Sequence, residues 1–141
     1  MTIRVITVAD AEAAAKLSGE LGYPASTEMM RGRIEALARL DGHVVYVACN
    51  SSAVVGWIDV GIAHHLQSEP YAEIGGLVVS SELRSAGIGG LLLARAEQWA
   101  RDQGISNMLV RSRISREAAH RFYDRAGYQR TKTSAVFTKS L

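Results

Sequence analysis

The stretch that decides the fold reads Tyr71-Ala72-Glu73-Ile74-Gly75-Gly76-Leu77-Val78-Val79, then Ser80-Ser81-Glu82-Leu83, then Arg84-Ser85-Ala86-Gly87-Ile88-Gly89-Gly90, and then Leu91 to Ala100. This pattern predicts a strand, a glycine-rich turn and an amphipathic helix. The expected apolar stripe of the helix contains Ile88, Leu91, Leu92, Ala96 and Trp99. Backbone N–H groups and the helix dipole favour anions at such a helix N-terminus, so we expect a phosphorylated cofactor at this turn.

Two common phosphate-binding loops do not fit the turn. A dinucleotide-binding loop needs a third glycine three residues after Gly89, where the chain has Leu92. A P-loop needs Gly-Lys followed by Ser or Thr, and the sequence has no such triplet. A strand–helix turn without a ligand remains the alternative reading of the turn alone.

The remaining elements are expected on both sides of this stretch. Apolar patterning and turn residues predict further strands at 3–7, 44–49, 53–62, 108–114, 128–133 and 135–138, and helices at 11–21, 27–40 and 116–126. We expect residues 64–70 to form a polar loop. Trp57, Asp59 and Gly61 should share one face of their strand. This order predicts an α+β fold, with a mixed sheet flanked by helices.

Composition narrows the class of protein. The 141 residues suffice for one domain, 48% are apolar, and the net charge of +2 is too small to indicate nucleic-acid binding. The single Cys49 excludes an internal disulfide and suits a reducing compartment. We expect no membrane association, because no apolar run is long enough for a span and no signal-peptide pattern opens the chain. The expected location is the cytoplasm.

Two motifs together resemble one known family. Arg84-x-x-Gly87-x-Gly89, after the strand and before the apolar helix, resembles the coenzyme A loop of the GNAT N-acetyltransferase superfamily. Downstream, Ala119-His120-Arg121-Phe122-Tyr123-Asp124-Arg125-Ala126-Gly127-Tyr128 resembles the second signature helix of that superfamily. The resemblance implies a single N-acetyltransferase domain over 1–141 that uses acetyl-CoA and no metal. It also implies a three-layer α/β/α fold with a mostly antiparallel sheet and about four helices.

The resemblance also implies roles for individual residues. Main-chain groups of Leu77, Val78 and Val79 would pair with the pantetheine arm, and an N–H near Val79 would hold the oxyanion. Tyr123 would protonate the departing thiolate. The pyrophosphate would be bound by backbone amides of Arg84, Ser85, Ala86, Gly87, Ile88, Gly89 and Gly90. Many members carry an asparagine seven residues before the tyrosine, whereas this chain has Arg116.

The reaction requires a neutral amine. A lysine-like amine has a pKa near 10, so presenting its free base at neutral pH costs roughly 4 to 5 kcal/mol without help. Glu73 is the candidate base, and simple alternation would put it on the face of Gly75, Leu77 and Val79. The alternative reading is a solvated carboxylate at the start of the strand.

The acceptor pocket carries weaker signals. Trp57 and Asp59 could line it, or Asp59 could be an exposed strand residue, and Tyr23 lies in a loop where the family often shapes specificity. His64-His65 resembles a metal pair only superficially, because no further ligand accompanies it.

The expected function is acetylation of a small primary amine by direct attack in a ternary complex. A protein lysine or N-terminus as acceptor, a non-catalytic acyl-CoA sensor and a homodimeric assembly also remain open.

Overall fold

The computed structural model describes residues 1–141 as two compact units, Met1–Val110 and Arg111–Leu141, and each is described by itself. The first unit is built on a five-stranded sheet of order β1-β2-β3-β4-β5. The strands are β1 (Thr2–Val5), β2 (His43–Asn50), β3 (Ala53–His65), β4 (Ser68–Val79) and β5 (Met108–Val110). Neighbours are antiparallel except β4 and β5, which are parallel, so the expected mixed and mostly antiparallel sheet is confirmed.

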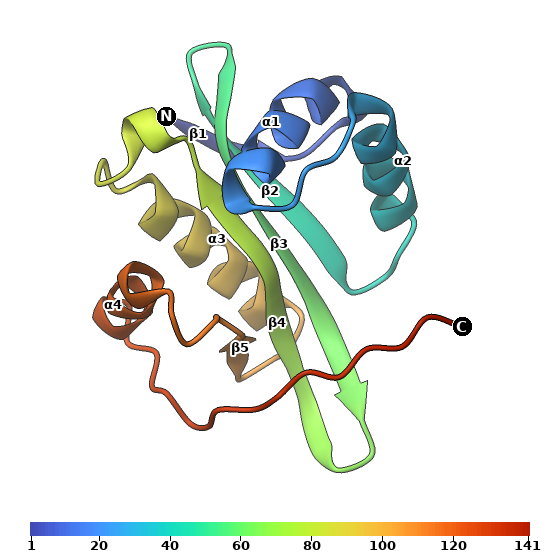
Figure 1. Ribbon diagram of the computed structural model, residues 1–141, viewed down its shortest axis with the longest axis vertical. Helices are drawn as coiled ribbons and strands as arrows, with labels where there is room; N and C mark the ends of the chain where they lie inside the picture. Colours follow the sequence, from blue (N-terminus) through green and yellow to red (C-terminus); the bar gives the residue numbers. More distant parts are fainter. The chain divides into compact units, whose positions relative to one another are not determined.

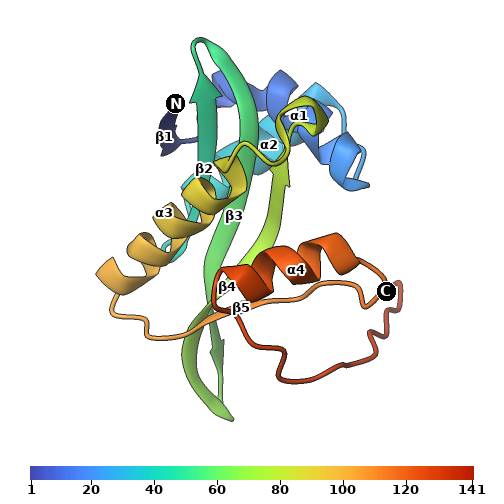
Figure 2. The same ribbon diagram turned by 90° about the vertical axis from the view of Figure 1, so that its left-hand side faces the viewer.

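Three helices cover the two faces of this sheet (Figures 1 and 2). The helices α1 (Ala11–Leu21) and α2 (Thr27–Ala38) lie on one face, and α3 (Ile88–Asp102) lies on the other. Gly22 ends α1 with a φ of +102°, a left-handed conformation that glycine adopts without strain. Ser26 caps the start of α2, because its side chain accepts a hydrogen bond from the Met29 N–H at 3.1 Å. Two one-turn 3-10 helices, Val8–Asp10 and Ser81–Leu83, precede α1 and α3.

The main core lies between the sheet and α3. Ile58 and Val60 of β3 and Leu92 and Ala96 of α3 are fully buried, and Leu93 is 2% exposed. The expected stripe on α3 is wrong in one position, because Leu91 is 50% exposed. At the edge of the sheet, Arg4 of β1 donates two hydrogen bonds to the Asp10 carboxylate, at 2.8 and 2.9 Å, before α1 begins.

Several sequence-based expectations need correction. Residues 64–70 are not a loop, because β3 continues to His65, a tight turn follows, and β4 begins at Ser68. The strand expected at 108–114 ends at Val110. In the second unit, α4 (Glu117–Arg125) is confirmed, but residues 128–133 and 135–138 form no strands. No helix in the chain is long and apolar enough to cross a membrane.

Candidate active site

The glycine-rich turn presents free backbone donors at the start of α3. Gly87 caps the helix with a φ of +82°, and Ser85 also has a positive φ, of +73°. These two left-handed residues flank Ala86, and turns that combine left-handed and right-handed residues can present successive N–H groups to an anion. The N–H groups of Gly87, Ile88, Gly89 and Gly90 have no backbone acceptor in the chain. The donor set therefore suits a phosphate group.

Neighbouring elements hold this turn in place. The Ser80 N–H donates to the Val55 carbonyl at 2.8 Å, and the Ser81 N–H donates to Glu20 Oε1 at 3.0 Å. The Ser81 N–H lowers the pKa of the Glu20 carboxyl below its usual value, because it stabilises the charged form. The side chain of Ile88 is 3% exposed and anchors the first turn of α3 in the core. The turn is thus fixed at both ends, while the N–H groups at the start of α3 have no backbone acceptor.

The edge of β4 beside the turn is open. The strand β5 pairs with β4 only at Ala72–Ile74, through Met108–Val110. From Gly76 onward β4 pairs only with β3, so the main chain of Leu77–Val79 has no strand on its second edge. An extended ligand can form main-chain hydrogen bonds along such an edge, much as a peptide adds to a sheet.

A β-bulge at Gly75 changes the face on which Glu73 lies. Asp59 pairs with Gly76 and Val60 pairs with Ile74, so Gly75 is an extra residue in β4. The expectation that Glu73 shares a face with Gly75, Leu77 and Val79 is therefore wrong. Glu73 pairs with Gly61 and lies on the face of Gly76 and Val78, which α1 and α2 cover. The extra residue reverses the alternation within one strand.

Trp57 and Asp59 lie on the same face as Glu73. The Trp57 indole N–H donates to the Ala14 carbonyl of α1 at 3.3 Å. A Cβ added at Gly76 would lie 2.9 Å from Cζ3 of Trp57, so the ring packs directly against the β4 backbone. Tyr23 follows α1 with its side chain 58% exposed, while its main chain is tied to Ser18 by two hydrogen bonds.

The sequence analysis missed His43, which opens β2. His43 pairs with Gly61, and its Nε2 contacts Oδ1 of Asp59, two residues along β3 on the same face. A Cβ at Gly61 would lie 2.5 Å from Nδ1 of His43, so the imidazole occupies space that a side chain would fill. The contact joins side chains on two neighbouring strands. Only the pairing register of the β2–β3 hairpin could have predicted that His43 and Asp59 meet.

Tyr123 belongs to the second unit, on α4. Its ring makes edge contacts with Phe122 and Tyr128, with centroids 5.1 and 5.7 Å away. Burial raises the pKa of the Tyr123 hydroxyl above its usual value, and the nearby Arg116 opposes this shift. The hydroxyl therefore stays protonated at neutral pH, as a proton donor must.

A family comparison identifies the chain. The model of the acetyltransferase (GNAT) family matches residues 11–128. The chain belongs to the GNAT acetyltransferase family. It is an N-acetyltransferase, like its relatives with named activities.

Two curated relatives illustrate the range of this family. The GNAT protein is 28% identical to an aminoglycoside N(6′)-acetyltransferase type 1 from Stenotrophomonas maltophilia, over 99% of this chain and 94% of the relative. It is 36% identical to an aminoalkylphosphonate N-acetyltransferase from Salmonella typhimurium, over 89% of this chain and 78% of the relative. Among solved structures, aminoglycoside N-acetyltransferase AAC(6′)-Iy in complex with CoA aligns over 99% of this chain and 95% of its own, with a TM-score of 0.89 at 18% identity. This likeness confirms the GNAT fold.

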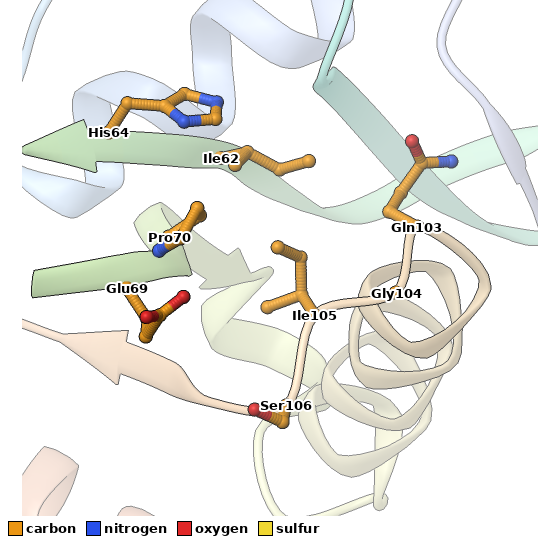
Figure 3. A pocket seen from close by; sticks show the side chains of 8 residues that line it. All are labelled: Ile62, His64, Glu69, Pro70, Gln103, Gly104, Ile105 and Ser106. Atoms are coloured by element: carbon orange, nitrogen blue, oxygen red, sulfur yellow. The ribbon is translucent and has the colours of Figure 1, made fainter.

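A separate pocket of about 440 Å³ lies at the other end of α3 (Figure 3). It is lined by Ile62 and His64 of β3, Glu69 and Pro70 of β4, and residues 103–106 after α3. The 15 residues of α3 span about 22 Å, so this pocket is distinct from the glycine-rich turn. The two adjacent histidines of β3 do not form a metal site. His65 Nε2 lies 3.0 Å from the Tyr71 hydroxyl, and the GNAT protein contains no group of three or more side chains that could hold a metal ion.

Proposed function

We propose that this GNAT protein transfers the acetyl group of acetyl-CoA to a primary amine of a small molecule, by direct attack in a ternary complex. One observation carries the proposal: the first unit combines backbone N–H donors without a backbone acceptor at the start of α3 with the carboxylates of Asp59 and Glu73 on one sheet face. The donors suit phosphate, and the carboxylates suit a cationic acceptor.

The proposed coenzyme site consists of the turn and the open edge of β4. Backbone amides from Arg84 to Gly90 would bind the pyrophosphate, and the side chain of Arg84 is exposed and adds positive charge. The main chain of Leu77, Val78 and Val79 would bind the pantetheine arm, with an N–H near Val79 donating to the acetyl oxygen. Acetyl-CoA would supply the activated acetyl thioester when it is bound, and CoA would leave as the free thiol. The solved AAC(6′)-Iy complexes with CoA and with a bisubstrate analogue support this assignment.

Two side chains would handle the protons. We assign Glu73 as the group that accepts a proton from the acceptor ammonium, directly or through water, and leaves a neutral amine. We assign Tyr123 as the donor to the leaving thiolate, which its protonated hydroxyl supports. Trp57, Asp59 and Tyr23 are the proposed acceptor-contacting residues.

The relatives favour a small acceptor. One is an aminoglycoside acetyltransferase and another acts on aminoalkylphosphonates, so both names describe small molecules that carry primary amines. Acetylation of a protein lysine or N-terminus is the second candidate. A non-catalytic acyl-CoA sensor is the third, and the presence of both Glu73 and Tyr123 argues against it.

Three further assignments belong to the proposal. The two units act as one N-acetyltransferase domain, which is supported by a family match that spans both. The protein forms a homodimer, supported by Val136 and Phe137, which are 82% and 92% exposed. The location is the cytoplasm, which the single unpaired Cys49 supports.

A thiol-release assay tests the proposal. The protein is mixed with acetyl-CoA and a panel of amines: aminoglycosides, aminoalkylphosphonates, polyamines, amino acids and lysine-containing peptides. We expect acetylation of at least one small amine, confirmed by mass spectrometry of the product. Tight coenzyme binding without turnover of any amine would favour the sensor, and turnover of peptides alone would favour protein acetylation.

A further inference from the structure

The proposed mechanism leaves one side chain of the acceptor face unused, His43. Its Nε2 contacts Oδ1 of Asp59, and this contact joins β2 to β3. The two side chains are 22% and 29% exposed, so a solute can reach them although most of their surface is shielded from water. Partial shielding strengthens the interaction of a carboxylate with a bound cation.

Two glycines define the surroundings of this pair. The His43 ring lies over Gly61, where a Cβ would come within 2.5 Å of Nδ1, so the ring position depends on the absence of a side chain. Gly75 lies on the other side, and a Cβ there would be 3.0 Å from Oδ2 of Asp59. Oδ1 is thus engaged by His43, whereas Oδ2 makes no hydrogen bond within the chain and faces the bulge.

We propose that His43 is a positioning residue for Asp59, and that Oδ2 of Asp59 binds the ammonium group of a cationic acceptor at the Gly75 bulge. The inference rests on the proposed function and names the group that recognises the acceptor. His43 holds the carboxylate through one oxygen before the acceptor arrives, so less side-chain freedom is lost on binding. The ammonium binds to Asp59, then an N–H bond breaks and the proton moves to Glu73, which leaves a neutral amine.

Asp59 would bind the ammonium group and Glu73 would accept its proton, which requires both carboxylates to lie on one face of the sheet. Asp59 and Glu73 lie on the same side of the sheet, because the bulge brings Glu73 opposite Gly61. Asp59 is held by a neighbour and suits binding, since a fixed acceptor gives a directional hydrogen bond to a cation. Acceptors without a cationic amine should gain nothing from this pair.

Steady-state kinetics with neamine, an aminoglycoside fragment that carries several primary amines, test the inference at saturating acetyl-CoA. Asp59→Asn keeps the size of the side chain and removes its charge, so we expect KM for neamine to rise at least about tenfold, with a smaller change in kcat. His43→Leu should raise KM about fivefold or more. His43→Gln retains an N–H donor of similar reach and should recover most of that loss. Gly75→Ala keeps both charges but fills the space beside Oδ2, so KM should rise as well.

Gly32→Ala is the matched control, because a Cβ there meets nothing within 4 Å. The dissociation constant of CoA and the melting temperature are measured for every variant. Unchanged KM in both Asp59→Asn and His43→Leu would overturn the inference, as would a loss confined to kcat. If His43→Leu fails to fold, the KM values of Asp59→Asn and Gly75→Ala test the inference, and unchanged values in both would overturn it. If the wild-type protein turns over no amine, the proposed function fails, and calorimetric binding of neamine to wild type and Asp59→Asn then tests the inference separately.

Discussion

Replacement of Tyr123 by phenylalanine tests the proposed proton donor most directly. A thiol has a pKa near 8.5, so at pH 7 an unprotonated thiolate lies about 2 kcal/mol above the thiol. This difference corresponds to a rate factor of about 30, and proton transfer at the transition state can add to it. We therefore expect kcat of Tyr123→Phe to fall roughly 30- to 100-fold at pH 7. The loss should shrink as the pH rises past 8.5, because the thiolate then needs no proton.

Because phenylalanine keeps the ring contacts of Tyr123, this variant tests the hydroxyl group alone. Phenylalanine keeps the edge contacts with Phe122 and Tyr128, so folding stability should change by less than about 1.5 kcal/mol. The assay is thiol release from acetyl-CoA between pH 6.5 and 9, with CoA binding measured by calorimetry. Tyr71→Phe is the control, because it loses one hydroxyl contact, with His65. A kcat loss below about threefold, or a loss that does not depend on pH, would refute the role of Tyr123.

Four further predictions concern the base, the fold and the assembly. Glu73→Gln should lower kcat and remove the part of the pH–rate profile that arises from titration of the general base. An unchanged profile would show that Glu73 is not that base. Asp10→Asn should lower the free energy of unfolding by about 2 kcal/mol at pH 7, because Arg4 loses a charged partner. The Arg4 guanidinium lowers the pKa of Asp10 in the folded protein, so this difference should vanish as the pH falls through that pKa, as urea unfolding at several pH values would reveal. Gly76→Val should cost about 1 to 3 kcal/mol and alter tryptophan fluorescence, because the new side chain meets the Trp57 ring, whereas an unaltered spectrum would contradict this packing. Light scattering should give the mass of a dimer, and Phe137→Asp should yield monomers if this surface forms the interface.

Strong local signals allowed much of the fold to be predicted from the sequence. The bounds of α1 were predicted correctly, because Asp10 precedes an alanine-rich run and Gly22 follows it. The strand–turn–helix order around the glycine-rich turn was also correct. On α3 the stripe was off by one position, with Leu93 buried in place of Leu91, because three consecutive leucines leave the face ambiguous.

The errors arose where tertiary structure overrides local pattern. Residues 64–70 are polar because they form the exposed end of a long hairpin, which resembles a loop in sequence. Two adjacent glycines carry no hydrophobic signal, so periodicity could not reveal which of them is the extra residue in β4. The role suggested for His43 depends on the pairing register of three strands, which no local pattern encodes.

The bulge at Gly75 makes the direction of Glu73 depend on where β4 holds its extra residue. Deleting Gly75 would leave Glu73 opposite Gly61, because the two halves of β4 would then join in one continuous register. If β4 kept its length but lost the bulge, Glu73 would instead lie opposite Ile62, and its carboxylate would face α3. That shift would also turn Ala72 and Ile74, now 0% and 3% exposed, away from the core. The strand can therefore lose its extra residue and keep Glu73 on the reactive side of the sheet, but it cannot straighten at constant length without exchanging that side with the structural one.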